Sequence, residues 1–392
     1  MLAATVRVTR DLDAAEEAVQ DAYVQALRTW ARDGVPDRPG AWLTTVARRN
    51  ALNALRRRQA LQTRLPLLVE PQDTGTPEPG AIPDDRLRLI FTCCHPALAQ
   101  EAQIALTLRL VCGVATPDIA QAFLVAEATM AARLTRAKKK IAAARIPYTV
   151  PSADGLPERV DAVLTVIHLL YATGHTAPSG QDLVRDELTG RALDLARMLR
   201  LLLPDEREAA GLLALLLVHH ARRATRTDAD GRLLRLREQD RSAWDRELIA
   251  EADGLVVAAL RAGPPGRFTL QAAIAALHAQ APAYQQTDWP QIRTLYDELL
   301  RVWPSPVVAL NRAVAVSMVD GPAAALADVE GLERDGRLAG YRYLPATKAD
   351  LLYRLGRHAE AADAYRAALA LSDNAAEQEF LAGRLGSVRP AS

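Results

Sequence analysis

The sequence contains few lysines, cysteines and aromatic residues and no long apolar run. These shortages exclude several classes of protein. Three cysteines in 392 residues exclude a disulfide framework and indicate a reducing compartment. The longest purely apolar run, residues 212–218, is too short to cross a membrane, and the first residues lack the apolar core of a signal peptide. We therefore expect a cytoplasmic protein without a membrane partner. Only four of the 48 basic residues are lysines, an arginine bias to which we assign no function.

The residues that are plentiful indicate helices. Alanine, leucine and arginine are good helix formers, and alternating runs of valine and isoleucine are scarce. Apolar residues recur at helical spacing along almost the whole chain. The first such stripe consists of Leu12, Ala15, Val19, Ala22, Ala26 and Trp30. The sequence therefore predicts an all-α fold.

Two breaks divide the helical pattern. Residues 66–85 are rich in proline, glycine, threonine and acid, which is typical of a linker, and residues 147–157 form a second break. We predict four segments. A small helical domain spans 1–60, a linker 61–83, a second small helical domain 84–147 and a long helical domain 156–392.

The end of the chain contains a weak internal repeat. Residues 348–374 read as helix, Leu-Gly turn and helix, with Ala361, Tyr365 and Ala368 at spacings of four and three. This resembles a tetratricopeptide (TPR) unit, and residues 305–332 form a poorer second copy. A single unit cannot bury its own apolar face, so it must stack on neighbouring helices, and such stacks often present a surface for a protein or peptide partner.

Residues 41–58 combine five arginines, two asparagines and a tryptophan with no acid, in a chain of formal net charge +1. On a helix, the apolar side would consist of Leu43, Val46, Ala47, Ala54 and Leu55. A second stripe would consist of Trp42, Thr45, Arg49, Asn53 and Arg56. Arginine binds phosphates, tryptophan stacks on bases and asparagine reads base edges, so this stripe suits melted or single-stranded nucleic acid. The alternative is a solvated basic helix whose tryptophan packs on a neighbour.

A helix-turn-helix pattern follows in the second small domain. Residues 116–123 form a short helix with Thr116 as its N-cap and Pro117 in its first turn, and residues 127–144 form the second helix. Met130, Leu134, Ala137 and Ile141 would face the core. The opposite side carries Thr129, Arg133, Arg136, Lys139 and Lys140, which suits phosphates and a DNA groove. The alternative is an amphipathic helix with a basic exposed side.

The sequence gives little support for catalysis or for a cofactor. Adjacent Cys93 and Cys94, with His95 and a distant Cys112, do not have the spacing of a zinc site, and buried packing is the simpler role. His219 and His220 end an apolar helix and fit a structural role. We recognise no phosphate-binding loop, nucleophile elbow or metalloprotease helix. We expect a protein that is not an enzyme and needs no metal.

Two stretches together resemble a known family. "DLDAAEEAVQDAYVQALRTW" followed by "RPGAWLTTVARRNALNALRRR" resembles region 2 of sigma-70-type RNA polymerase sigma factors, and residues 84–147 resemble region 4. The presence of only these two regions resembles the extracytoplasmic-function (ECF) group, and the long extension resembles the ECF subgroup with a TPR-like C-terminal domain. The resemblance implies a sigma factor that directs promoter recognition and DNA melting in transcription initiation. Its partners would be promoter DNA and the β′ clamp and β flap of core RNA polymerase.

The resemblance also implies roles for individual residues. Contacts to the polymerase core would come from Glu17, Gln20, Asp21, Tyr23 and Leu27. Binding and melting of the minus-ten element would use Trp42, Arg48, Arg49, Asn50 and Asn53, with Arg56, Arg57 and Arg58 on the adjacent backbone. Contacts to the minus-thirty-five element would come from Thr129, Arg133, Arg136, Lys139 and Lys140. The linker 61–83 would thread toward the RNA exit path.

One departure from the family pattern leaves other functions open. Family members usually have another helix's worth of residues before "DLDAAEEA", so part of the first helix of region 2 is expected to be missing here. One alternative is a DNA-binding transcriptional regulator that does not engage polymerase. The other is a TPR scaffold whose sigma-like part has lost its function. Residues 11–30 discriminate between them, because only a sigma factor needs that helix as a polymerase contact.

Overall fold

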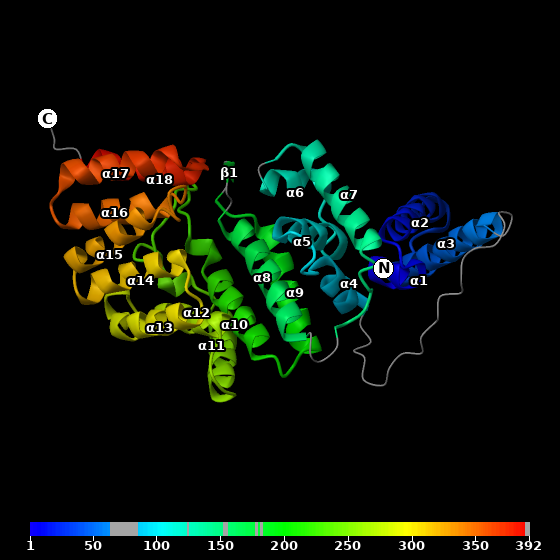
Figure 1. Ribbon diagram of the computed structural model, residues 1–392, viewed down its shortest axis with the longest axis horizontal. Coiled ribbons are helices and arrows are strands. Elements are labelled where there is room, and N and C mark those ends of the chain that lie inside the picture. The colour runs from blue at the N-terminus through cyan, green and yellow to red at the C-terminus, as the bar shows by residue number, and fades with distance from the viewer. Residues whose placement is uncertain (63–84, 124, 152–155, 177–178, 181–182, 389–392) are drawn as a thin grey trace. The chain divides into compact units, whose positions relative to one another are not determined.

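The computed structural model describes residues 1–62, 85–123, 125–151, 156–176, 179–180 and 183–388 (Figure 1). The chain forms two compact units, unit 1 from Met1 to Val166 and unit 2 from Ile167 to Ser392. Helices form the layers of both units, which confirms the predicted all-α class. Most of the predicted linker lies outside the described residues.

Unit 1 begins with three helices that pack on one another. They are α1 (Leu2–Thr9), α2 (Leu12–Asp33) and α3 (Pro39–Gln62). Asp11 caps α2 by accepting a hydrogen bond from the Ala14 amide at 3.0 Å, and Gly34, at φ 81°, ends it in a conformation that favours glycine. Ala22, Val46 and Ala47 form the buried centre of this packing.

The predicted core side of α3 needs one correction. Leu43 and Leu55 are half-buried and Val46 and Ala47 are buried, as expected, but Ala54 is exposed. Ala51 is buried instead, although the sequence pattern did not single it out. Ala51 lies one helical turn after Ala47 and so continues the buried side of α3.

The rest of unit 1 contains the predicted helix-turn-helix. Its helices are α4 (Asp85–Cys93), α5 (Gln100–Leu106), α6 (Thr116–Ala122) and α7 (Glu127–Ala143), with a π-helical turn, η1 (Thr107–Val111), after α5. Thr116 is the first residue of α6 rather than a residue before it, a difference of one position at a helix end. Met130, Leu134, Ala137 and Ile141 are all buried, which confirms the predicted core side of α7.

Unit 2 is built around a helix that is apolar on every side. Helix α8 (Leu156–His175) crosses the boundary between the units, and α9 (Asp186–Leu202) and α10 (Arg207–Ala221) follow it. Helix α10 contains the apolar run 212–218 and packs against α9, α11 (Arg246–Arg261) and α12 (Arg267–Gln280). A helix that other helices surround in this way needs no polar face. The packing of α10 therefore accounts for the apolar run 212–218, and no membrane is needed to explain it.

The chain ends in a series of helical hairpins. They consist of α13 (Trp289–Val302), α14 (Pro306–Val319), α15 (Pro322–Asp335), α16 (Tyr343–Arg354), α17 (His358–Ala370) and α18 (Ala375–Val388), and consecutive helices pack side by side (Figure 1). Gly356, at φ 75°, makes the predicted turn between α16 and α17, and Ala361, Tyr365 and Ala368 are buried. The predicted helix pairs are confirmed, whereas their assignment as TPR units stays a prediction.

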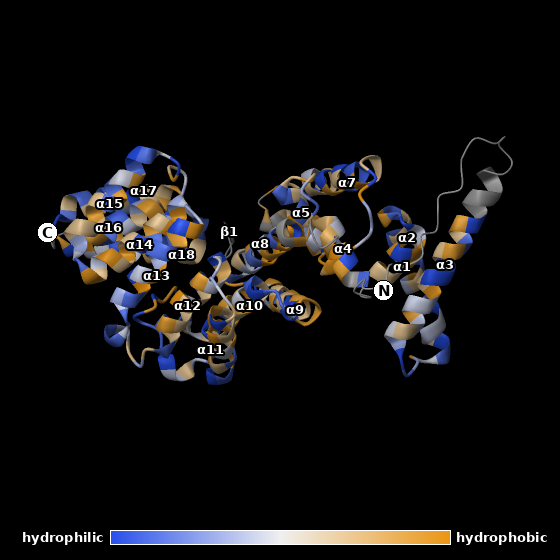
Figure 2. Cartoon of the chain, turned by 60° about the horizontal axis from the view of Figure 1, so that its bottom comes forward, coloured by the Kyte–Doolittle hydropathy of each residue, from blue (hydrophilic) through white to orange (hydrophobic). Residues whose placement is uncertain are grey.

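Two short features complete the description. Ser179–Gly180 (β1) and Asp373–Asn374 (β2) form a two-residue parallel pair in which Ser179 lies opposite Asp373. Hydrophilic and hydrophobic residues are interspersed along the labelled helices in Figure 2. Among the described helices, none combines the length and apolar character that spanning a bilayer requires.

Candidate nucleic-acid and polymerase interfaces

Helix α3 presents a row of basic and amide side chains to solvent. Arg48, Arg49, Asn53 and Arg56 are exposed, and Asn50 is half-buried. Thr45 is also exposed, and its hydroxyl donates to the Ala41 carbonyl at 2.9 Å. Arg57 and Arg58 lie within α3, but their side chains fall outside the described part of the chain. The exposed cations are therefore available to a polyanion.

Trp42 has a packing role in addition to any contact with nucleic acid. It is half-buried against the core of Ala22, Val46 and Ala47, and its ring lies 5.4 Å from the ring of Trp30 at a tilt of 58°. This is the neighbour packing that the alternative interpretation of residues 41–58 foresaw. Its predicted contact with the minus-ten element stays a prediction.

The predicted polymerase-binding residues all lie on the exposed side of α2. Glu17, Gln20 and Asp21 are exposed, as are Tyr23 (51%) and Leu27 (76%). Val24 is exposed as well and adds to their apolar surface, although the sequence did not single it out. Large apolar side chains grouped on a surface indicate a site for another macromolecule, here bordered by acids.

Helix α7 presents the predicted minus-thirty-five residues unequally. Thr129, Arg136, Lys139 and Lys140 are exposed. Arg133 is half-buried, forms a 2.9 Å ion pair with Glu101 and stacks over the Phe123 ring at 5.7 Å. Its charge is already partly neutralised, which a prediction from α7 alone could not foresee because Glu101 lies on α5.

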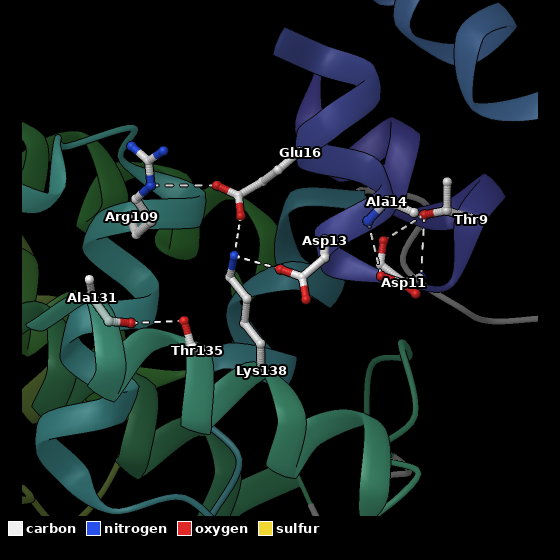
Figure 3. Close-up of polar contacts among 9 residues, drawn as sticks. All are labelled: Thr9, Asp11, Asp13, Ala14, Glu16, Arg109, Ala131, Thr135 and Lys138. Carbon is white, nitrogen blue, oxygen red and sulfur yellow. Dashed lines mark hydrogen bonds and ion pairs between the residues drawn. The ribbon is translucent and has the colours of Figure 1, made fainter. Parts of the chain in front are cut away.

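A contact between α2 and α7 was missed by sequence reasoning. Lys138 donates to Asp13 at 2.9 Å and to Glu16, and Arg109 lies 3.4 Å from Glu16 (Figure 3). Burial favours the neutral amine of Lys138, but the hydrogen bonds and charges of Glu16 and Asp13 outweigh it and raise its pKa. The one available signal was that Lys138 follows Leu134 by four positions and so borders the core side of α7.

The cysteines are buried packing residues. Cys93, Cys94 and Cys112 are buried and form no disulfide, and the Cys94 sulfur lies 3.5 Å from the Thr107 hydroxyl. Burial raises the pKa of Cys93 well above its usual value and that of Cys94 to about 12, so both stay protonated thiols. Among the described residues no group of histidine, cysteine and acid could hold a metal ion.

Taken together, the geometry defines a helical protein with a helix-turn-helix, an exposed basic helix and an exposed apolar-acidic helix. Comparison with known families agrees. Residues 2–61 match Sigma-70 region 2, residues 88–141 match Sigma-70 region 4, and residues 159–260 match a family of unknown function (DUF6596). An uncharacterized protein of Rhizobium meliloti (strain 1021) is 45% identical over 388 residues, which cover 97% of this chain and 91% of that protein.

The chain therefore belongs to the sigma-70 family of RNA polymerase sigma factors. It contains regions 2 and 4 and carries a C-terminal extension, an arrangement consistent with the ECF type. Membership in this family supports a non-enzymatic role in promoter recognition.

Proposed function

We propose that this chain binds core RNA polymerase, directs it to a promoter and helps melt the DNA. Its C-terminal helical unit would regulate that activity or bind a partner. The observation that supports this most is that the two matched sigma regions expose, on separate helices, the side chains that each contact needs. These are apolar and acidic on α2 and basic on α3 and α7.

In this proposal the division of labour follows the helices. Glu17, Gln20, Asp21, Tyr23 and Leu27 on α2 bind the β′ clamp, and the cations and amides of α3 bind the minus-ten element. Thr129, Arg136, Lys139 and Lys140 on α7 bind the minus-thirty-five element, and Arg133 joins them only when its pair with Glu101 opens. The β flap is the remaining polymerase contact that the family implies.

The experiment is in vitro transcription with the full chain, core polymerase and the promoter upstream of its own gene. We expect specific transcripts that depend on the added chain. Core binding is measured in parallel by gel filtration. Absence of both core binding and transcripts would favour a regulator that does not engage polymerase, and absence of DNA binding as well would favour a scaffold.

Variants on two helices test the division of labour. Tyr23→Ser with Leu27→Gln removes apolar surface from α2 without opening a cavity, because both side chains are exposed, and should weaken core binding by about tenfold or more. Arg49→Glu with Asn53→Asp on α3 should abolish promoter opening, read by permanganate reactivity, while core binding stays intact. Loss of both activities in the α3 variant would contradict the assignment.

A further inference from the structure

Unit 2 contains a cavity that no sigma-region role requires. Its volume is about 590 Å³, within the range of ~300–1,000 Å³ typical of small-molecule sites. The walls come from the segment 233–237, from Tyr284 and Arg342, and from helices α12, α13, α14, α16, α17 and α18. The helical hairpins at the end of the chain therefore border a cavity in addition to packing on one another.

Aromatic side chains make up a large part of the cavity lining. Its aromatic lining consists of Tyr284, Trp289, Tyr296, Tyr343, Tyr365 and Phe380, together with His278. The Trp289 ring lies 5.5 Å from Tyr284 and 5.1 Å from His278, both edge-on. Such a lining offers ring faces and edges to a flat apolar body.

The charges in the wall do not balance. Arg235, Arg237, Arg342, Arg354 and Arg384 line the cavity, but only two carboxylates, Asp350 and Glu377, do so. Both carboxylates already form ion pairs with arginines of the wall. Arg342 Nε lies 2.6 Å from Glu377, and Arg384 Nη2 lies 3.1 Å from Asp350.

Two guanidinium groups remain without a carboxylate partner among the described residues. Arg354 donates to the hydroxyl and the carbonyl of Ser317, each at 2.9 Å, and Arg237 forms no ion pair with an acid in the part of the chain that the structure describes. The positive charges of both arginines affect the phenol of Tyr284, which also lines the cavity. Burial raises the pKa of Tyr284, and the charges of Arg237 and Arg354 oppose that rise. The guanidinium groups of Arg237 and Arg354 therefore lie near Tyr284.

The other arginines are fixed in place by stacking. Arg342 lies 4.8 Å from the centre of the Tyr343 ring, and Arg384 lies 5.6 Å from that of Tyr365. Arg235 lies 5.9 Å from the Phe380 ring and pairs with Glu238. These three side chains therefore already have partners in the cavity wall.

We propose that this cavity binds a small organic anion with an aromatic or apolar body. The acidic group would pair with Arg237 and Arg354, which have no carboxylate partner, and the body would lie against Tyr284 and Trp289. Arginine provides a planar fork of donors that suits a carboxylate or a sulfonate. This inference goes beyond promoter recognition, and it can be tested without polymerase, so its failure would leave the proposed transcription role untouched.

The test uses the full chain and a pair of fluorescent probes. 8-Anilino-1-naphthalenesulfonate carries an aromatic body and one negative charge, and N-phenyl-1-naphthylamine is its counterpart without the sulfonate. We expect the anionic probe to bind saturably at one site per chain. The neutral probe should bind more weakly, because it makes no ion pair.

Substitutions then locate the site. Arg237→Ala removes an exposed side chain and should weaken the anionic probe several-fold, and adding Arg354→Met should bring the loss to about tenfold or more. Neither change should alter binding of the neutral probe more than about twofold. Ala346→Trp, placed in the wall, should block both probes, with circular dichroism confirming that the helices persist.

The matched control is Arg261→Ala, an exposed arginine of unit 2 that does not line the cavity. It changes the net charge by the same amount and should leave both probes unaffected. Equal binding of the anionic probe by the native chain and the Arg237→Ala, Arg354→Met variant would overturn the proposal. So would probe binding that survives Ala346→Trp, or the absence of saturable binding.

Discussion

At the scale of single residues, unit 2 contains half-buried histidines whose surroundings favour the neutral imidazole. His168 packs against the Phe268 ring at 5.6 Å, and its Nδ1 has no hydrogen-bond partner among the described residues. Burial, helped by the positive charge of Arg267, lowers the pKa of His168 to about 4. His278 behaves similarly, since burial and the charge of Arg222 lower its pKa to about 4. Both histidines are neutral at pH 7.

This burial makes stability depend on acid. The unfolded chain takes up a proton as the pH falls below about 6.5, but folded His168 stays neutral until about pH 4, so stability falls between these values. We expect the free energy of unfolding to decrease by about 2 kcal/mol for His168 between pH 7 and pH 5. The free energy of unfolding at each pH is measured by denaturant titration, with tryptophan fluorescence as the signal.

The variant His168→Leu should show a shallower decrease than the native chain over the same interval. His358→Gln, an exposed histidine of the same unit, is the control and should leave the profile unchanged. An identical pH profile for His168→Leu and the native chain would show that His168 does not carry the effect.

Glycine matters at one helix crossing in particular. A Cβ at Gly211 on α10 would lie 2.6 Å from the backbone nitrogen of Thr269 on α12, whereas a Cβ at Gly254 on α11 would meet nothing within 4 Å. Gly211→Ala should therefore destabilise unit 2 by about 1–3 kcal/mol. Gly254→Ala should stabilise it by about 0.5–1 kcal/mol, because alanine favours the helix. Thermal unfolding of the two variants measures both changes. An equal effect of the two substitutions would contradict the argument that α10 and α12 approach too closely at Gly211 to admit a side chain.

At the scale of elements, the helices and their exposed sides followed from periodicity, but their partners did not. The pattern predicted α2, α3, α6 and α7, because helix propensity and apolar spacing are local properties. It missed the ion pairs of Arg133 and Lys138, since their acidic partners lie on other helices. The same limit explains why Trp42 packs on Trp30, a contact that only the packing of α2 on α3 produces.

The pair between α2 and α7 should be stronger than an ordinary surface ion pair. Lys138 and Glu16 have side chains only 15% and 16% exposed. A double-mutant cycle with Lys138→Met and Glu16→Gln should give a coupling energy of about 1–2 kcal/mol, above the ~0.2–1 kcal/mol of exposed pairs. The exposed pair of Arg301 and Glu298 is the reference. Coupling no larger than in that pair would mean that the contact does not hold α2 to α7.

At the scale of the whole molecule, positive charge is concentrated on particular helices, although the chain as a whole is nearly neutral. The formal net charge is +1, yet exposed cations gather on α3 and α7. Long-range attraction to DNA is therefore weak, and affinity must come from direct contacts with phosphates. The two basic helices also belong to separately matched regions, so each can contribute its own contacts.

Salt dependence tests this distribution. The logarithm of the affinity of the polymerase complex for promoter DNA should fall linearly with the logarithm of the salt concentration. If Lys140 binds a phosphate as proposed, Lys140→Ala should reduce the slope by about one, because it removes that contact. Arg261→Ala, which changes the net charge equally but lies in unit 2, should leave the slope unchanged. A reduced slope for Arg261→Ala would indicate that net charge, and not local contact, governs binding.

The sequence by itself determined the helical class, the main helix positions, the basic sides of α3 and α7 and the membership in the sigma-70 family. These depend on neighbours within a few positions or on motifs that remain contiguous. Only the tertiary structure decided that Lys138 bonds to α2, that Ala51 rather than Ala54 is buried, and that five arginines and six aromatic rings line one cavity. Those residues come from elements far apart in the chain, and no local pattern encodes which helices pack together.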